Sequence, residues 1–254
     1  MDLAEQAVVV TGAGSGMGKA TAYRLARRNA LVAALDIAAK PVLALAQELG
    51  GLGIECDVGS ESSVRTAIQR VVAEFGPPRV LVNCAGIAAA QRISGRKGPH
   101  DLGLFQKVIR TNLVGTFNMM RLVAEEMKQL DPVGESGARG VMINTASVAA
   151  YEGQIGQAAY SASKGGVVAL TLPAARELAQ FGIRVVTVAP GLIGTPMLHA
   201  MPEEVQASLA NQVPFPRRLG SADEFAALVE HIIDNEMLNG EVIRLDGAIR
   251  LQSE

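Results

Sequence analysis

The stretch Thr11-Gly12-Ala13-Gly14-Ser15-Gly16-Met17-Gly18 decides the fold because of what stands on either side of it. The apolar run Ala7-Val8-Val9-Val10 comes directly before it, and an amphipathic stretch over residues 16–29 follows. Clustered glycines between an expected strand and an expected helix are typical of a phosphate-binding loop, because they allow a tight turn and the helix start attracts negative charge. We therefore expect nucleotide contacts from Gly12, Ser15, Gly16, Met17 and Gly18.

Short apolar runs alternate with longer amphipathic stretches along the rest of the chain. Runs of Val, Ile and Leu without polar alternation are typical of strands covered on both faces, and their alternation with helices predicts a parallel sheet. Further strands are expected at Leu31–Leu35, Leu52–Cys56, Val80–Val82, Gly140–Asn144, Ile183–Val188 and Val242–Leu245. Further helices are expected over residues 39–49, 60–75, 101–130, 157–180 and 221–234. The expected fold class is α/β, a single-domain Rossmann-type doubly wound parallel sheet over residues 1–254, with helices on both faces.

Two proline-containing segments need a separate interpretation. Pro173 falls inside the 157–180 stretch, where it removes a backbone hydrogen bond. Because the apolar spacing continues beyond it, we expect one kinked helix. Residues 193–216 contain four prolines and no strand pattern. A long irregular excursion inside a compact domain is often a binding lid, so we expect a substrate lid here.

Composition argues against several classes of function. The net charge is −2, and aromatic residues make up only 4% with no Trp, so we expect no nucleic-acid partner. No apolar run reaches the roughly 18 residues of a membrane span, and the first residues lack a targeting pattern. We therefore expect no membrane partner and a cytoplasmic location. Two cysteines and three widely spaced histidines are too few for a disulfide framework or a zinc site, so no metal is expected.

Asp36 indicates the choice of cofactor. It ends the second expected strand, where a carboxylate accepts hydrogen bonds from an adenosine ribose and repels a 2′-phosphate. No Lys or Arg lies within three residues of Asp36, so the sequence favours NAD over NADP. The alternative role for Asp36 is a helix N-cap. Asp57 and Val58, after the third strand, are candidates for adenine contacts, again with capping as the alternative.

Tyr160 and Lys164 stand four residues apart, which places them on one face of an expected helix. A nearby ammonium favours the phenolate form of tyrosine, but lowering the pKa by about 3 requires about 4 kcal/mol. A second positive charge, such as an oxidised nicotinamide ring, would therefore help. Ser147 precedes Tyr160 and can hydrogen-bond a substrate oxygen. The pattern Tyr-x-x-x-Lys alone often occurs by chance in helices. Only its combination with Ser147 indicates the oxidation or reduction of an alcohol.

In order and spacing, these residues are similar to those of the short-chain dehydrogenases/reductases, a resemblance that covers the whole chain. Asn83-Cys84-Ala85-Gly86, Asn112 and Pro190-Gly191 also carry it. The resemblance implies a catalytic tetrad of Asn112, Ser147, Tyr160 and Lys164. It also implies cofactor contacts from Asn83, Cys84, Ala85, Gly86, Tyr160, Lys164, Pro190, Gly191, Ile193 and Thr195. Cys84 replaces the second Asn that is usual in the family, and a small buried side chain is the expected role there rather than a redox nucleophile.

Within this family the chain resembles the subgroup of type II 3-hydroxyacyl-CoA dehydrogenases, which also carry Asn-Cys-Ala-Gly. Residues 144–150, 156–160, 212–216 and 239–250 resemble the same subgroup. The resemblance implies NAD-dependent interconversion of (3S)-3-hydroxyacyl-CoA and 3-oxoacyl-CoA, activity on other secondary alcohols or hydroxysteroids, and a homotetramer. Two alternatives stay open. One is a 3-oxoacyl-[acyl-carrier-protein] reductase that uses NADPH, and the other is a catalytically silent nucleotide sensor or assembly subunit.

The segment Gln91–His100 is rich in positive charge and follows the fourth expected strand. Charges of this kind usually belong to a solvated surface loop. However, ligands of open α/β sheets bind at the carboxyl edge of the strands, where this segment is expected to lie. The alternative hypothesis is therefore that Arg96 and Lys97 attract the phosphates of coenzyme A.

Overall fold

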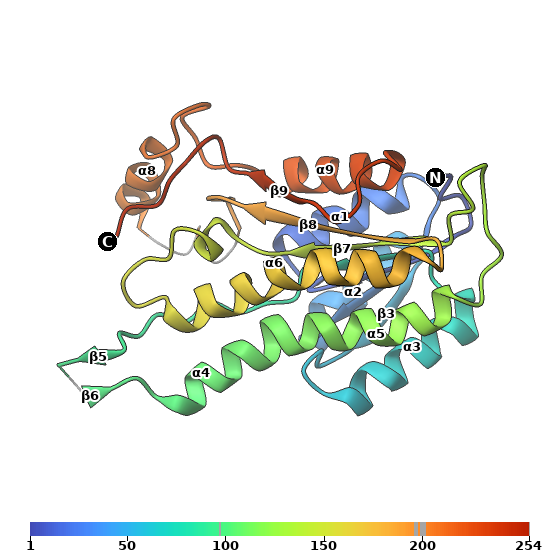
Figure 1. Ribbon diagram of the computed structural model, residues 1–254, viewed down its shortest axis with the longest axis horizontal. Helices are drawn as coiled ribbons and strands as arrows, with labels where there is room; N and C mark the ends of the chain where they lie inside the picture. The colour runs from blue at the N-terminus through green and yellow to red at the C-terminus, as the bar shows by residue number, and fades with distance from the viewer. Residues whose placement is uncertain (97, 196–197, 199–201, 254) are drawn as a thin grey trace.

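The computed structural model describes residues 1–96, 98–195, 198 and 202–253. A seven-stranded sheet with the order β3-β2-β1-β4-β7-β8-β9 runs through the molecule, which confirms the doubly wound architecture (Figure 1). All of its neighbouring strands are parallel. The strands are β1 (Ala7–Thr11), β2 (Leu31–Asp36), β3 (Leu52–Glu55), β4 (Val80–Asn83), β7 (Gly140–Thr145), β8 (Ile183–Pro190) and β9 (Val242–Leu245). The strand order switches direction between β1 and β4, and ligands bind at such switch points.

Helices cover both faces of the sheet (Figure 1). The longer ones are α1 (Gly16–Ala26), α2 (Ala39–Leu49), α3 (Glu61–Phe75), α5 (Gly115–Met127), α6 (Ala158–Ala179) and α9 (Ala222–Asp234). Side chains of β1 alternate between two cores: Val8 and Val10 pack into one cluster with residues of α1 and α9, whereas Val9 packs into the other with residues of α3 and α5. Burial on both faces explains why this strand is apolar at every position. As expected, α6 continues through Pro173.

Three segments differ from the sequence expectation. The single helix expected over residues 101–130 is divided into α4 (Leu102–Ile109), a π-helical turn (Arg110–Val114) and α5. The expectation of a wholly irregular lid is wrong for α8 (Glu203–Asn211), a helix with no buried residue and therefore no strong apolar pattern. The segment expected as a loop after β4 contains a short hairpin of β5 (Ser94–Gly95) and β6 (Gly98–Pro99).

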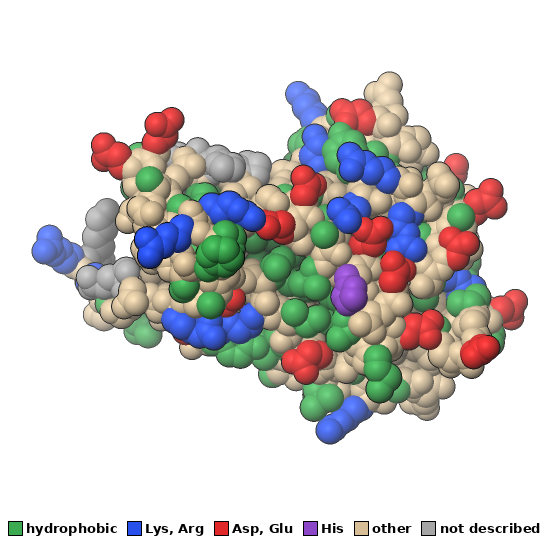
Figure 2. Space-filling model, turned by 90° about the horizontal axis from the view of Figure 1, so that it is seen from above, with side chains coloured by type: hydrophobic (Ala, Val, Ile, Leu, Met, Phe, Trp, Pro, Cys, Tyr) green, Lys and Arg blue, Asp and Glu red, His purple; other side chains and the backbone are tan. Residues whose placement is uncertain are grey.

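The carboxyl ends of the sheet strands face the end of the molecule that carries α8, the β5–β6 hairpin and the C-terminus, on the left in Figure 1. In Figure 2, Lys and Arg side chains surround a group of apolar side chains on the same half of the molecule. The fold therefore collects its long loops and a share of its positive charge at the edge where a ligand is expected. Among the described residues, no helix is long and apolar enough to cross a membrane.

Candidate active site

The glycine-rich loop lies in close contact with the segment after β4. Gly12 has a φ of +63°, and a Cβ atom there would stand 2.7 Å from the backbone N of Ala85. Gly16 also has a positive φ, of +51°. The side chain of Ser15 makes no capping hydrogen bond at the start of α1, so the first N–H groups of this helix stay open to an anion. The glycine-rich loop and the open start of α1 therefore fit the phosphates of a dinucleotide.

Asp36 points into this loop from the end of β2. Its Oδ2 accepts a hydrogen bond from the backbone N of Gly14 at 2.9 Å, and its Oδ1 accepts one from the backbone N of Ala38 at 2.9 Å. The N-cap of α2 is Ala38, so Asp36 does not serve as the helix cap. Each carboxylate oxygen keeps further acceptor capacity. The position beside the phosphate loop suits the ribose contact expected of Asp36.

Asp57 and Val58 lie at the end of the neighbouring strand β3. Asp57 accepts a hydrogen bond from the backbone N of Gly59 at 2.9 Å and forms an exposed ion pair with Arg110, with Nη2 3.2 Å from Oδ2. Ser60, rather than Asp57, caps α3. The backbone O of Val58 accepts a hydrogen bond from Asn118 at 2.9 Å. The side chain of Asp57 is thus held at the carboxyl edge, as an adenine contact would require.

Polar contacts at the end of β4 stabilise the switch point. The hydroxyl of Thr11 accepts hydrogen bonds from the backbone N atoms of Cys84 and Ala85, each at 3.1 Å. The buried amide of Asn83 donates to Oδ1 of Asn144 on β7 at 2.9 Å. These contacts join β1, β4 and β7 next to the glycine loop. This role of Thr11 is not among the contacts expected from the sequence, although a hydroxyl at the last position of a strand before such a loop is a usable signal.

Tyr160, Lys164 and Ser147 converge at the carboxyl end of β7. Lys164 lies on α6 and donates a hydrogen bond from Nζ to the backbone O of Thr145 at 2.7 Å. Its Nζ also stands 5.8 Å from the centre of the Tyr160 ring. Ser147 precedes the 3₁₀ turn Val148–Ala150 and hydrogen-bonds the Tyr160 side chain. The three side chains that the sequence pattern grouped therefore lie together.

Burial dominates the electrostatics of this group. It raises the pKa of the Tyr160 phenol above its ordinary value, an effect that the hydrogen bond with Ser147 opposes. Burial also lowers the pKa of the Lys164 ammonium to about 8. Without a bound cofactor, desolvation thus disfavours both the Tyr160 phenolate and the Lys164 ammonium. A phenolate therefore requires additional positive charge beside it, which agrees with the argument from the sequence.

Asn112 reaches the same place from the π-helical turn, a geometry often found at functional sites. Its Oδ1 accepts a hydrogen bond from the backbone N of Ile87 at 2.8 Å. Its Nδ2 donates to the backbone O of Ile87 at 2.9 Å and to Oγ of Ser163 at 3.0 Å. A Cβ atom on Gly86 would stand 3.3 Å from Oδ1 of Asn112 and 3.6 Å from Nζ of Lys164. Asn112 therefore ties the β4 loop to α6 beside Lys164.

Cys84 lines the same region but is poorly suited to nucleophilic chemistry. Burial raises the pKa of its thiol to about 12. The hydroxyl of Thr145 lies 3.8 Å from its Sγ. Because the thiolate is the reactive form, a thiol with this pKa is largely inert at neutral pH. Cys84 is therefore a small, half-buried side chain rather than a redox nucleophile.

The end of β8 and the segment after it form the last part of the site, at the carboxyl edge of the sheet. The backbone N of Gly191 donates to the backbone O of Leu245 at 2.9 Å, and Ile193 forms an isolated bridge with Gly220. Beyond them, the backbone O of Thr195 accepts a hydrogen bond from Leu198 at 2.9 Å. Pro190, Gly191, Ile193 and Thr195 thus follow one another along the carboxyl edge.

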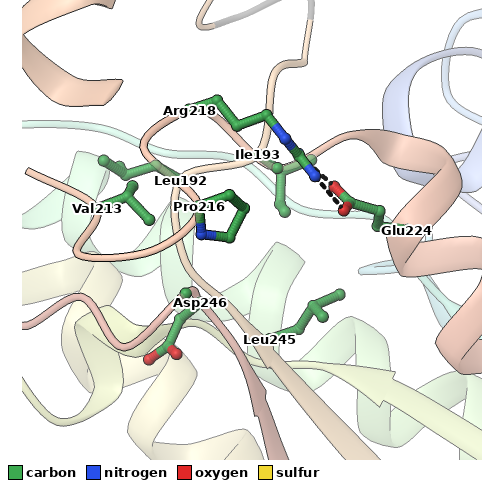
Figure 3. A pocket seen from close by; sticks show the side chains of 10 residues that line it. Leu192, Ile193, Val213, Pro216, Arg218, Glu224, Leu245 and Asp246 are labelled. Carbon is green, nitrogen blue, oxygen red and sulfur yellow. Dashed lines mark hydrogen bonds and ion pairs between the residues drawn. The ribbon is translucent and has the colours of Figure 1, made fainter. Parts of the chain in front are cut away.

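A cavity of about 120 Å³ lies between this segment, the end of the lid and the turn after β9 (Figure 3). Leu192, Ile193, Val213, Pro216 and Leu245 supply its apolar lining. Arg218 makes two hydrogen bonds to Glu224 across its rim, at 2.9 and 2.7 Å. The segment just after the expected lid is therefore fastened to the start of α9.

The β5–β6 hairpin and the segment before α6 border an open groove. Arg92, Ile93 and Ser94 line it on one side, and residues 153–156, Ala158 and Ser161 line it on the other. The backbone N of Gln91 donates to the backbone O of Gly156 at 2.8 Å, which joins the two sides. The side chains of Arg92 and Arg96 form no ion pair or hydrogen bond with another residue that the structure describes. Lys97 lies outside the described residues.

Comparisons with known proteins show the family of this chain. A family model described as short chain dehydrogenase matches residues 6–206. The chain is 56% identical to 3-hydroxyacyl-CoA dehydrogenase type-2 of Homo sapiens over 248 residues, which cover 96% of this chain and 95% of the human protein. It is 50% identical to the Drosophila melanogaster protein of the same name, with 96% of each chain covered. The crystal structure of 3-hydroxyacyl-CoA dehydrogenase type-2 from Mycobacterium avium is similar with a TM-score of 0.93 and 45% identity, over 98% of this chain and 97% of that one.

Proposed function

Because this chain belongs to the short chain dehydrogenase family, we propose that it is an NAD-dependent oxidoreductase that interconverts (3S)-3-hydroxyacyl-CoA and 3-oxoacyl-CoA. The observation that carries the proposal is the meeting of Asn112, Ser147, Tyr160 and Lys164 beside a glycine loop that Asp36 enters. The substrate class rests on the similarity to the human and Drosophila dehydrogenases. Other secondary alcohols and hydroxysteroids are proposed as further substrates.

The side chains divide the chemistry between them. Bound NAD supplies the acceptor for the hydride that leaves the alcohol carbon. The Tyr160 phenolate takes the hydroxyl proton, while the hydroxyl of Ser147 holds the substrate oxygen against it. Lys164 supplies positive charge next to the phenol and binds the nicotinamide ribose. The amide of Asn112 is engaged by Ile87 and Ser163, so we assign it a positioning part.

A spectrophotometric panel tests the proposal. Both enantiomers of 3-hydroxyacyl-CoA at several acyl lengths, steroids and simple secondary alcohols are each assayed with NAD and with NADP. The proposal expects the highest kcat/KM with a (3S)-3-hydroxyacyl-CoA and NAD. A preference for NADPH and carrier-protein substrates would identify the reductase instead, and no turnover with any member of the panel would point to a silent nucleotide sensor.

Changing Asp36 should change the cofactor preference. Asp36→Ala combined with Ile37→Arg removes a carboxylate beside the phosphate loop and adds a cation at an exposed neighbouring position. We expect the kcat/KM ratio for NAD over NADP to fall by tenfold or more, because a 2′-phosphate loses a repulsive partner and gains an attractive one. Glu55→Ala, at the paired position on β3, is the control and should leave the ratio unchanged. A wild-type preference for NADP would make the assignment of Asp36 wrong.

Charge reversal on the β5–β6 side of the groove should weaken binding of coenzyme A substrates. The variant Arg92→Glu/Arg96→Glu is expected to raise KM for acetoacetyl-CoA a few-fold to about tenfold, since each screened contact contributes about 0.5–1 kcal/mol. The increase should be larger at low salt than at high salt. Arg27→Glu/Arg70→Glu, which reverses two exposed charges elsewhere, is the matched control. Equal effects on KM for an uncharged alcohol, or no effect on either substrate, would mean that these arginines are solvated surface residues with no part in substrate binding.

We also propose a homotetramer, as the family resemblance implies. Ala162 and Ala169 are exposed on α6, and Phe117 on α5 is 50% exposed, so these helices present apolar surface. Gly166 on α6 packs against Leu113 of its own chain, so it is not part of this exposed surface. Light scattering should give the mass of four chains, and a stable monomer at micromolar concentration would contradict this. The cytoplasmic location likewise stays a prediction.

A further inference from the structure

The segment that joins Ser147 to Tyr160 has little anchorage in the core. Val148 and Ala149 are buried, but every residue from 150 to 157 is half-buried or exposed. Polar contacts hold this stretch instead. The backbone N of Ile155 donates to the backbone O of Ser253 at 2.9 Å, and the side chain of Glu152 forms the ion pairs described next. These contacts therefore act together with the packing of α6 against the 3₁₀ turn in placing the two side chains that flank the segment.

Arg244, at the end of edge strand β9, is the main partner of this segment. Its Nη1 and Nη2 donate to the two carboxylate oxygens of Glu152 at 2.8 and 2.9 Å. The ring of Tyr151 covers the guanidinium, with 5.3 Å between Cζ and the ring centre. The side chains of Arg244 and Glu152 are only 24% and 21% exposed. A two-bonded pair of this kind fixes orientation as well as distance, because the guanidinium is planar and rigid.

The same guanidinium also holds the turn after β9. Its Nε donates to Asp246 at 2.7 Å, and its Nη2 donates to the backbone O of Ile249 at 3.0 Å. This turn lies against the end of β8, since a Cβ atom on Gly191 would stand 2.8 Å from Cβ of Asp246. It also supports the lid, because Gly247 lines the cavity of Figure 3. Arg244 thus joins the Ser147–Tyr160 segment to the end of β8, where cofactor contacts are expected. Arg250 makes longer contacts to the same two carboxylates, 3.5 Å from Glu152 and 3.3 Å from Asp246.

We propose that Arg244 is a positioning residue for the reaction. It holds the proton acceptor on α6 and the cofactor-facing end of β8 in one arrangement, so that the substrate oxygen and the hydride-donating carbon are aligned at the same time. The effect acts through Glu152 and Asp246 and involves no contact of Arg244 with the substrate. The proposal rests on the proposed function only in taking Tyr160 as the proton acceptor. A displacement of about 1 Å can lower a rate by about 10²-fold, so loss of the pair should be visible in kcat.

The test compares Arg244→Gln, Arg244→Lys and Glu152→Gln with the wild type in kcat, KM, NAD affinity and the primary isotope effect of a substrate deuterated at the alcohol carbon. We expect Arg244→Gln and Glu152→Gln to lower kcat by tenfold or more and to change NAD affinity by less than threefold. The isotope effect should increase, because hydride transfer becomes slower relative to the other steps. Arg244→Lys keeps the positive charge but loses the planar guanidinium that makes two hydrogen bonds to Glu152. It should retain more activity than Arg244→Gln. The double variant Arg244→Gln/Glu152→Gln should be no slower than Arg244→Gln alone.

Arg28→Gln is the control, because Arg28 pairs with both oxygens of Asp234 through its Nη1, at 3.0 and 2.8 Å, and its Nη2 donates to the backbone O of Met1 at the N-terminus. It should lower the melting temperature without changing kcat or the isotope effect. Values of kcat within twofold of wild type in Arg244→Gln and Glu152→Gln would overturn the proposal. If Arg244→Gln does not fold, Glu152→Gln decides alone, since it leaves the contacts of Arg244 to the β9 turn in place. Failure of the proposed function would appear in the wild type instead, and the variants would then be compared on whichever alcohol the wild type oxidises.

Discussion

Tyr160→Phe should lower kcat by roughly 10²- to 10⁴-fold, the usual contribution of a general acid or base. The substitution removes one oxygen and keeps the ring, so the packing of α6 around it is retained. Because the hydroxyl bonds Ser147 and not the glycine loop, the affinity for NAD should change by no more than a few-fold. Stopped-flow turnover with the best substrate of the panel and a fluorescence titration of NAD measure the two quantities separately.

Tyr23→Phe is the control for this substitution. Tyr23 lies on α1 and hydrogen-bonds Glu48, so its hydroxyl is absent from the catalytic group. Its removal should leave kcat unchanged. If Tyr160→Phe retained more than about a tenth of the wild-type kcat, well above what a general acid–base group leaves behind, Tyr160 would have to be removed from the mechanism.

Lys164→Met should abolish most turnover and, at the same time, alter how stability depends on pH. Burial of the ammonium lowers its pKa to about 8 from the ordinary value of 10.5. Between these two values the unfolded chain binds more protons than the folded chain, so the free energy of unfolding rises with pH. The full effect is on the order of 3 kcal/mol, since each pKa unit corresponds to about 1.4 kcal/mol. Below pH 8 the buried charge is present and lowers stability. Methionine lacks this charge.

Denaturant unfolding of the cofactor-free protein at pH 7, 8, 9 and 10 tests the second part of this prediction. The stability advantage of Lys164→Met over the wild type should be largest at pH 7 and should shrink as the pH rises towards 10. Lys107→Met, at an exposed position of α4, is the matched control and should follow the wild type at every pH. A difference between Lys164→Met and wild type that stays constant with pH would mean that Lys164 is not buried as a charge. A kcat near the wild-type value would remove Lys164 from the catalytic group.

Local sequence patterns were sufficient for most of the framework of this protein. The bounds of α2 and β9 agree with the expected ranges. A helix with one apolar face and a short strand rich in Val, Ile and Leu are both visible as local patterns in the sequence. The spacing of Tyr160 and Lys164 placed both side chains on one face of α6, since helix geometry is the same wherever the helix lies. Asp36 was found in the same way, from its place at the end of a strand.

Other features have no local signal. The π-helical turn that presents Asn112 interrupts a stretch that reads as one uniform helix, because the turn is set by contacts to Ile87 and Ser163. The helix α8 buries no residue and so has little apolar pattern to detect. The inward direction of Gly166 on α6 follows only from its contact with Leu113, because a Cβ atom there would stand 2.6 Å from Cδ2 of that residue.

The sequence by itself determined the strand–helix alternation, the phosphate loop and the residue types of the site, since these follow from periodicity and spacing over a few residues. Only the tertiary structure decided how the groups act on one another. Arg244 and Glu152 are 92 positions apart and meet through the sheet. The lowered pKa of Lys164 results from burial among segments that are distant in the chain. Burial and long-range pairing are properties of the folded surroundings, which no run of neighbouring residues encodes.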